Sequence, residues 1–339
     1  MIRPPLALGL LVAFWLLPCA APAEPAPRPD ASPVHVLIRL HIDNLVNVDE
    51  LRETWQVSGD LVERWKAPKL AYARHGRLDS HRDLAPASTW QPTLGFINEA
   101  APATLTDLDL YETPDGSVVR VQHFTVTLAT QLDLRRFPFD KQELPIVMEP
   151  RGHDADRILL FADTKRSSVA AARYVGLSQW RNPVLSARRG IRQSDDFDVN
   201  ALIFTLTLQR GSNSYVWKFI LPLFLIVLIS WVSFWLSHEE FKTKDQLGTL
   251  VSTLLIIVAF NITATASLPR TNYVTYIDAF LLACFMFVIL AIAAVVGTHF
   301  LQMRQQEDAA YRMRRMAGTL LPVTFVIAQI GMLAWFFRI

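Results

Sequence analysis

The 339-residue chain is 51% hydrophobic and carries a formal net charge of +2. That small charge, without basic clusters interleaved with aromatic residues, argues against a nucleic-acid partner. The two cysteines, Cys19 and Cys284, both lie in apolar runs, so a disulfide framework and a cysteine metal site are excluded. No cofactor is expected. The length and apolar content suit one soluble domain followed by a membrane bundle.

Residues 1–23 have the pattern of a secretory signal peptide. A positive charge at Arg3 precedes an apolar run over 6–17. The small residues of 21–23 then fit a cleavage site. Residues 24–33 are rich in proline and alanine, and we expect them to form a flexible tail. The domain that follows is therefore expected outside the cytoplasm.

Alternating apolar and polar residues predict an all-β domain over residues 34–213. Apolar side chains occupy every second position in 34–40 and again in 202–208, which is the period of a strand with one buried face. A long strand is expected over 118–130, entered through the turn sequence Pro-Asp-Gly at 114–116. A segment of this length suffices for one β-sandwich.

No catalytic or metal-binding arrangement emerges from this domain. The eight histidines are scattered along the chain. No pair has metal-ligand spacing on one predicted element, so each is expected to be a surface or core residue. No nucleophile is paired with a base. The sequence therefore predicts that the protein is not an enzyme, and a hydrolytic ectoenzyme is the least favoured hypothesis.

Four apolar segments follow, each long enough to cross the ~30 Å hydrocarbon core of a bilayer. They are expected at 215–236, 245–267, 274–300 and 316–338. Six lysine and arginine residues lie in the first and third connections, whereas the second carries only Arg270. By the positive-inside rule, the first and third connections face the cytoplasm. This agrees with an exported N-terminal domain.

The second apolar segment carries a narrow stripe of small residues. At 3.6 residues per turn, one of its faces consists of Asp245, Gly248, Ser252, Leu255, Ala259, Ile262 and Ala266. Such a face suits the wall of a pore, with an acid at one end and apolar rings able to dewet the passage. It also suits close helix packing without a pore. Because each chain has one helix of this kind, a pore would need several copies in a ring.

Several motifs resemble those of the pentameric ligand-gated ion channels, the Cys-loop receptor superfamily. The sharpest is DLRRFPFDKQ over 133–142, which matches the family's FPFD loop. The further matches are Trp65, the WQPTLGFIN segment over 90–98, Arg210, Pro222 and the LPR sequence over 268–270. Thr130 and Leu144 stand where animal members carry the two cysteines of the loop. The sequence therefore resembles the bacterial branch, which lacks that disulfide.

The resemblance implies an all-β extracellular immunoglobulin-like sandwich followed by an all-α bundle of four transmembrane helices. It implies a homopentamer with a central pore, placed in a bacterial inner membrane with the N-terminal domain in the periplasm. The expected partners are identical subunits, permeant monovalent cations, membrane lipids and an unidentified small agonist, either an amine or a proton. The main alternative is a membrane-anchored solute-binding protein that does not conduct.

The resemblance also implies roles for individual residues. A coupling relay between the two domains is implied at Glu50, Asp140, Arg210, Pro269 and Tyr273. A guanidinium between two carboxylates can rearrange without losing every partner, which favours a relay over the alternative of a plain surface ion pair. An agonist site between subunits is implied at Glu149, Arg151, Tyr174 and Phe197. Leu255 is implied as the central ring of the gate, and Asp245 as the acidic ring of a cation-selective channel, despite the adjacent Lys244.

Overall fold

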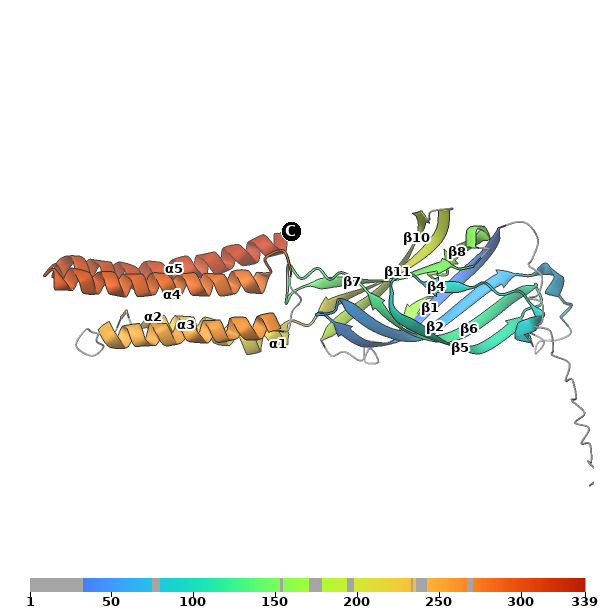
Figure 1. The fold of residues 1–339 in the computed structure, drawn as a ribbon, viewed down its shortest axis with the longest axis horizontal. Helices are drawn as coiled ribbons and strands as arrows, with labels where there is room; N and C mark the ends of the chain where they lie inside the picture. Colours follow the sequence, from blue (N-terminus) through green and yellow to red (C-terminus); the bar gives the residue numbers. More distant parts are fainter. Residues whose placement is uncertain are drawn as a thin grey trace, which may run out of the picture.

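The structure is a computed structural model that describes residues 33–74, 80–152, 155–170, 179–193, 198–232, 234–235, 243–266 and 271–338. A β-sandwich and a bundle of helices follow each other along one long axis (Figure 1). The expected signal peptide, and all of the expected tail except Pro33, lie outside the described residues.

The sandwich consists of a seven-stranded and a four-stranded sheet. Its strands are β1 Val34–Asp49, β2 Thr54–Lys66, β3 Arg82–Asp83, β4 Leu94–Phe96, β5 Glu99–Glu112, β6 Ser117–Ala129, β7 Lys141–Pro150, β8 Ile158–Ala162, β9 Ser168–Val169, β10 Trp180–Gln193 and β11 Asp198–Arg210. The larger sheet has the order β3-β5-β6-β2-β1-β8, and β9 also pairs with β1. The smaller sheet has the order β10-β11-β7-β4. The predicted sandwich is confirmed.

The core of the sandwich follows the predicted alternation. In β1, Val36, Ile38 and Leu40 are fully buried, while the side chains between them are half-buried or exposed. In β11, Leu202 and Phe204 are likewise buried. Because successive side chains of a strand point to opposite faces, these residues form the inner faces of the two sheets. The apolar area that they remove from water is the main force that holds the sheets together.

Within the described residues, five α-helices and one π-helical turn form the membrane bundle. They are α1 Asn213–Tyr215, continued by the π-helical turn η4 Val216–Ile220 into α2 Leu221–Val232, and then α3 Thr243–Ala266, α4 Tyr276–Met303 and α5 Glu307–Arg338. In the part of the chain that the structure describes, four stretches are long and apolar enough to cross a membrane, namely Asn213–Val232, Thr243–Thr263, Tyr276–Met303 and Glu307–Phe337. They correspond to the four expected crossings.

The π-helical turn η4 ends two residues before Pro222. Proline lacks an N–H and its ring clashes with the carbonyl four residues earlier. In the widened turn, the N–H of Leu221 instead donates to the carbonyl oxygen of Val216, five residues back. The extra residue in this turn lets the helix continue past Pro222. The periodicity of the sequence did not predict the π-helical turn.

The last helix is longer than expected. The sequence predicted a start at 316, where the apolar run begins, but α5 starts at Glu307 and only 304–306 separate it from α4. The segment 307–316 is charged, yet it is rich in the good helix formers alanine, arginine, glutamate and methionine. The side chain of Arg314 also donates from Nε to the carbonyl oxygen of Phe234 at 3.1 Å. The hydropathy pattern therefore located the membrane span but not the residue at which the helix begins.

Candidate gating interface and pore-facing helix

Arg210 lies at the end of β11, where the sandwich meets the helices. Antiparallel pairing of β11 with β7 places Gln209 opposite Lys141, so Arg210 falls beside Asp140. The backbone N–H of Arg210 donates to the carbonyl oxygen of Asp140 at 3.0 Å, and its Nε donates to the Asp140 carboxylate at 2.8 Å. Its Nη1 donates to Glu50, just after β1, also at 2.8 Å. The structure thus brings together three residues that are far apart in the sequence.

This cluster is not a surface ion pair. The side chains of Arg210, Asp140 and Glu50 are 0%, 1% and 18% exposed. The guanidinium also lies over the rings of Trp180, at 4.5 Å, and Phe137, at 5.0 Å, which adds a cation–π attraction. Burial alone would lower the pKa of Arg210, but the two carboxylates outweigh burial and raise the pKa. The charge on Arg210 is therefore permanent.

The loop before β7 is folded around Gln142. Nε2 of Gln142 donates to the Asp140 carboxylate at 2.6 Å and to the carbonyl oxygen of Asp133 at 2.8 Å. Its Oε1 accepts from the N–H of Asp133 at 3.1 Å. One side chain therefore closes the loop 133–140 and orients the carboxylate that binds Arg210. Arg210 is therefore joined to this loop through the Asp140 carboxylate.

The same loop rests on the membrane bundle. The hydroxyl of Tyr273 accepts from the N–H of Leu134 at 3.0 Å and donates to the carbonyl oxygen of Leu132 at 3.3 Å. The ring of Phe139 lies 5.5 Å from that of Tyr276 in α4 and 5.6 Å from that of Phe337 in α5. In Figure 1, the C-terminal end of α5 accordingly lies beside the sandwich. Of the expected relay, Pro269 lies outside the described residues.

An open cleft of about 670 Å³ lies next to this contact. It is lined by Leu51, Arg52, Glu53, Gln131, Leu132, Asp133, Arg135, Thr271, Asn272 and Tyr273. These residues come from the β1–β2 turn, the loop before β7 and the segment before α4. Most of them are polar, so this part of the junction between the sandwich and the helices is lined by polar groups.

The expected agonist residues are only partly described. Glu149 is buried near the end of β7, whereas Tyr174 and Phe197 lie outside the described residues. Arg151 folds back on its own subunit: its Nη2 donates to the carbonyl oxygen of Phe96 at 3.0 Å and pairs with Glu99 at 3.2 Å. The absence of a side chain at Gly95 leaves room for the guanidinium of Arg151, because a Cβ at this position would lie 1.9 Å from Nε of Arg151. Glu99 thus balances the cation expected at the agonist site.

The predicted stripe of α3 faces away from the rest of its own chain. Asp245, Gly248, Ser252, Leu255, Ala259, Ile262 and Ala266 are all exposed. Leu255 and Ile262, the largest apolar side chains of the stripe, are each 64% exposed. On the opposite face, Leu250, Thr253 and Ile257 are buried. The bundle therefore leaves the whole stripe available to another molecule or to solvent.

A buried ion pair in the sandwich was missed from the sequence. Glu63 of β2 is fully buried, and its Oε2 accepts from Nη2 of Arg120 at 2.5 Å and from Nε at 3.0 Å. Its Oε1 has no hydrogen-bond partner among the described residues. Burial outweighs the attraction of Arg120 and raises the pKa of Glu63 to about 7. The sequence did contain a signal for this buried charge, because Glu63 lies two residues from each of the core residues Leu61 and Trp65 and therefore on the same face of β2.

Comparisons with known proteins agree with this architecture. The family model of the neurotransmitter-gated ion-channel ligand binding domain matches residues 22–212. The model of the neurotransmitter-gated ion-channel transmembrane region matches residues 219–323. The boundary between the two matches coincides with the junction at Arg210 between the sandwich and the bundle.

Individual relatives come from bacteria and animals. The chain is 29% identical over 348 residues to a proton-gated ion channel of Gloeobacter violaceus, covering 99% of this chain and 94% of that protein. It is 26% identical over 301 residues to the gamma-aminobutyric acid receptor subunit beta-4 of Gallus gallus, covering 85% of this chain and 61% of that one. It is 33% identical over 186 residues to a gamma-aminobutyric acid receptor subunit beta of Lymnaea stagnalis, covering 55% and 37%. The chain belongs to the neurotransmitter-gated ion-channel family, as a ligand-gated channel subunit with an N-terminal ligand-binding domain outside the membrane and four membrane-spanning helices.

Proposed function

We propose that five copies of the chain assemble around a central axis and form a cation-conducting pore lined by α3. The observation that carries this proposal is the exposure of all seven stripe residues together with the burial of the opposite face of the same helix. A ring of identical chains would bury these surfaces against one another or turn them toward a shared axis. A membrane-anchored solute-binding protein without conduction would need no such surface.

The residue types of the stripe favour contact with a water-filled axis over contact with lipid. Gly248, Ser252 and Ala259 offer little apolar area, so they gain little from contact with acyl chains. Asp245 begins the stripe, and a carboxylate facing lipid is costly unless it reaches water. Leu255 and Ile262 would then form two apolar rings in a passage that is otherwise lined by small or polar residues. Rings of this kind close a pore by dewetting it.

Cation selectivity is expected to depend on Asp245. Carboxylates from several subunits at one level of the pore would concentrate cations and repel anions. Replacing Asp245 by asparagine removes this charge at nearly constant shape. In a KCl gradient across a bilayer, we expect the reversal potential of the wild type to lie near the K⁺ equilibrium potential and that of Asp245→Asn to move toward zero.

The matched control changes the neighbouring exposed cation. Lys244→Gln is expected to shift the reversal potential in the opposite direction or to leave it unchanged, and Asp245→Glu should retain the selectivity of the wild type. A wild-type reversal potential near the Cl⁻ equilibrium value would contradict the cation proposal.

We place the agonist between neighbouring sandwich domains, at the level of Glu149 and Arg151, with Tyr174 and Phe197 as expected contributors. Glu149 supplies a buried negative charge, and the pairing of Arg151 with Glu99 removes a repulsive cation. This charge pattern favours a small amine. Recording currents from purified protein in bilayers during a screen of small amines tests the proposal directly.

Protons are the second candidate agonist, and a specific observation favours them. Glu63 is fully buried, and its pKa is raised to about 7, so it changes charge near neutral pH. It joins β2 to Arg120 of β6, which also donates to the carbonyl oxygen of Pro92 at 2.9 Å. Protonation would weaken this ion pair inside the sheet. The similarity to a proton-gated channel points in the same direction.

The Glu63 pKa predicts how stability depends on pH. Because the folded pKa lies near 7 and the unfolded value near 4.5, the folded state binds the proton more tightly. The contribution of Glu63 to the free energy of unfolding is fully present below about pH 4.5 and is lost as the pH rises through about 7. The difference between the two pKa values corresponds to a contribution of roughly 3 kcal/mol. Glu63→Gln, which mimics the protonated side chain, should flatten the dependence of the thermal midpoint on pH.

The control for Glu63 is Glu143→Gln, at an exposed position of β7, which should change neither stability nor gating. If protons are the agonist and act through Glu63, Glu63→Gln should also abolish or shift activation by low pH. Unchanged pH activation in Glu63→Gln would exclude Glu63 as the proton sensor.

A further inference from the structure

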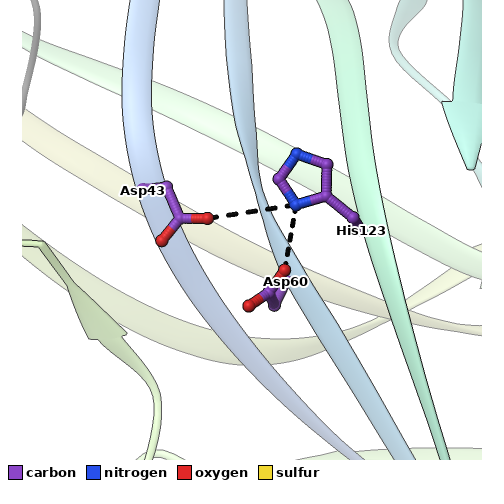
Figure 2. Close-up of side chains that lie close together, drawn as sticks. All are labelled: Asp43, Asp60 and His123. Carbon is purple, nitrogen blue, oxygen red and sulfur yellow. Dashed lines mark hydrogen bonds and ion pairs between the residues drawn. The ribbon is translucent and has the colours of Figure 1, made fainter. Parts of the chain in front are cut away.

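A histidine and two carboxylates meet on the outer face of the large sheet. Nδ1 of His123 lies 2.9 Å from Oδ1 of Asp60 and 4.0 Å from Oδ2 of Asp43. One donor atom from each of the three side chains lies within 4.8 Å of the other two. In Figure 2 the carboxylates of Asp43 and Asp60 both point toward the same ring nitrogen of His123. The three side chains are 42%, 40% and 35% exposed for His123, Asp43 and Asp60.

The strand register explains why these residues meet. Asp60 of β2 lies opposite His123 of β6 on one side and opposite His41 of β1 on the other. The pairing of β1 with β2 then slips at Asp43, because Ile42 pairs with Gly59 while Asn44 pairs with the next residue, Ser58. Asp43 is thus the extra residue of a β-bulge. Bulges redirect a side chain while the flanking core residues stay in place.

Gly59 is required for this local geometry. A Cβ at Gly59 would lie 2.1 Å from the carbonyl oxygen of His41, so only glycine allows the bulged strand to approach so closely. The core is preserved on both sides of the bulge, since Ile42 and Leu45 are fully buried. The sheet therefore contains a local irregularity whose effect is to bring a second carboxylate to His123.

His41 holds Asp43 in position from the other side. Its Nε2 lies 3.3 Å from Oδ1 of Asp43, the oxygen that does not face His123. Its Nδ1 lies 2.5 Å from the hydroxyl oxygen of Ser168 in β9. Side chains that orient a metal ligand through a second hydrogen bond are typical of metal centres. The cluster thus has candidate ligands and a support for one of them.

We propose that His123, Asp43 and Asp60 bind a divalent transition-metal ion of the Zn²⁺ class, with His41 as a positioning residue. Three protein ligands of nitrogen and oxygen type, with a fourth position open to water, are typical of zinc. Ligands at zinc distances lie about 3.3 Å apart in a tetrahedron, so exposed carboxylates need shift by about 1 Å or less. A Ca²⁺ ion would need six to eight oxygen ligands, and an imidazole suits zinc, copper or nickel better.

This inference goes beyond the proposed channel and differs from the expectation from the sequence, which named no metal ligand. No histidine was expected to be a ligand because no pair has metal spacing on one element. The ligands come instead from three strands, and Asp43 reaches the site through a bulge that periodicity does not reveal.

Metal binding is tested on the full-length protein purified with a tag that contains no histidine. Zn²⁺ affinity is measured by isothermal titration calorimetry, and Co²⁺ is used as a spectroscopic probe of the coordination geometry. The wild type should bind one Zn²⁺ per chain, and its Co²⁺ form should show the visible absorption of a four- or five-coordinate site. His123→Ala and Asp60→Asn should weaken Zn²⁺ binding by about 100-fold or more, and His41→Ala by about tenfold.

His81→Ala is the matched control, because His81 is an exposed histidine outside the cluster, and its affinity for Zn²⁺ should equal that of the wild type. Gel filtration of each variant verifies that the fold and assembly are retained. The proposal is overturned if the wild type binds no Zn²⁺, if it binds Ca²⁺ in preference, or if His123→Ala binds Zn²⁺ as tightly as the wild type. These results do not depend on the channel opening, so they are distinct from a failure of the proposed function.

Discussion

Replacing Arg210 by alanine is expected to abolish agonist-evoked current while the protein still reaches the membrane. Arg210 joins the turn after β1, through Glu50, to the loop that rests on the helices, through Asp140. Without it, the turn after β1 loses its ion pair to the loop that contacts Tyr273 and α4. Bilayer recordings with the agonist found by the amine and pH screen provide the measurement.

The same substitution leaves a buried carboxylate without its main partner. Breaking a buried pair from one side costs about 3–5 kcal/mol, so a loss of current could reflect unfolding. The double variant Arg210→Ala with Asp140→Asn removes that carboxylate at nearly constant shape and should recover much of the thermal stability. It should remain silent. Recovery of normal gating in the double variant would show that Arg210 does not couple the two domains.

The second large effect is expected at Leu255. Exposing apolar surface to water costs about 25 cal/mol per Å², so a ring of leucines resists filling by water. Leu255→Ser places a hydroxyl at each of these positions and should favour the wet, conducting state. The agonist concentration for half-maximal current should fall by about tenfold or more, equivalent to about 1.4 kcal/mol, and spontaneous openings should increase.

Ile256→Ser provides the comparison for the leucine ring. Ile256 is exposed on the same helix but is turned by about 100° from Leu255. It loses the same kind of apolar side chain, yet its activation should match that of the wild type. An unchanged threshold in Leu255→Ser, or an equal shift in both variants, would remove Leu255 from the gate.

The sequence predicted those parts of the fold that follow from period and hydropathy. Alternation identified β1 and β11, and apolar length identified four membrane spans. Local backbone adjustments were not predictable in this way. The π-helical turn before Pro222 and the helical start of α5 at Glu307 depend on hydrogen bonds to Val216 and from Arg314, which no pattern of polarity records.

The candidate sites, like the fold, were only partly predictable from the sequence. The resemblance to a known family indicated Glu50, Asp140 and Arg210, but only the structure showed that the guanidinium is fully buried. Glu63 was detectable as a charge at a core position of β2. The cluster of His123 with Asp43 was not, because it requires both the register of three strands and the bulge opposite Gly59.

The most direct test of the central claim is the reactivity of single cysteines along α3 with a charged, water-soluble thiol reagent. The background is Cys284→Ala, which removes the buried cysteine of α4, and the reagent is applied to both sides of proteoliposomes. If α3 lines a water-filled axis, Ser252→Cys and Ala259→Cys should gain the mass of the reagent, while Thr253→Cys and Ile257→Cys should not. Protection of both stripe positions, or equal labelling of all four, would contradict a shared pore lined by α3.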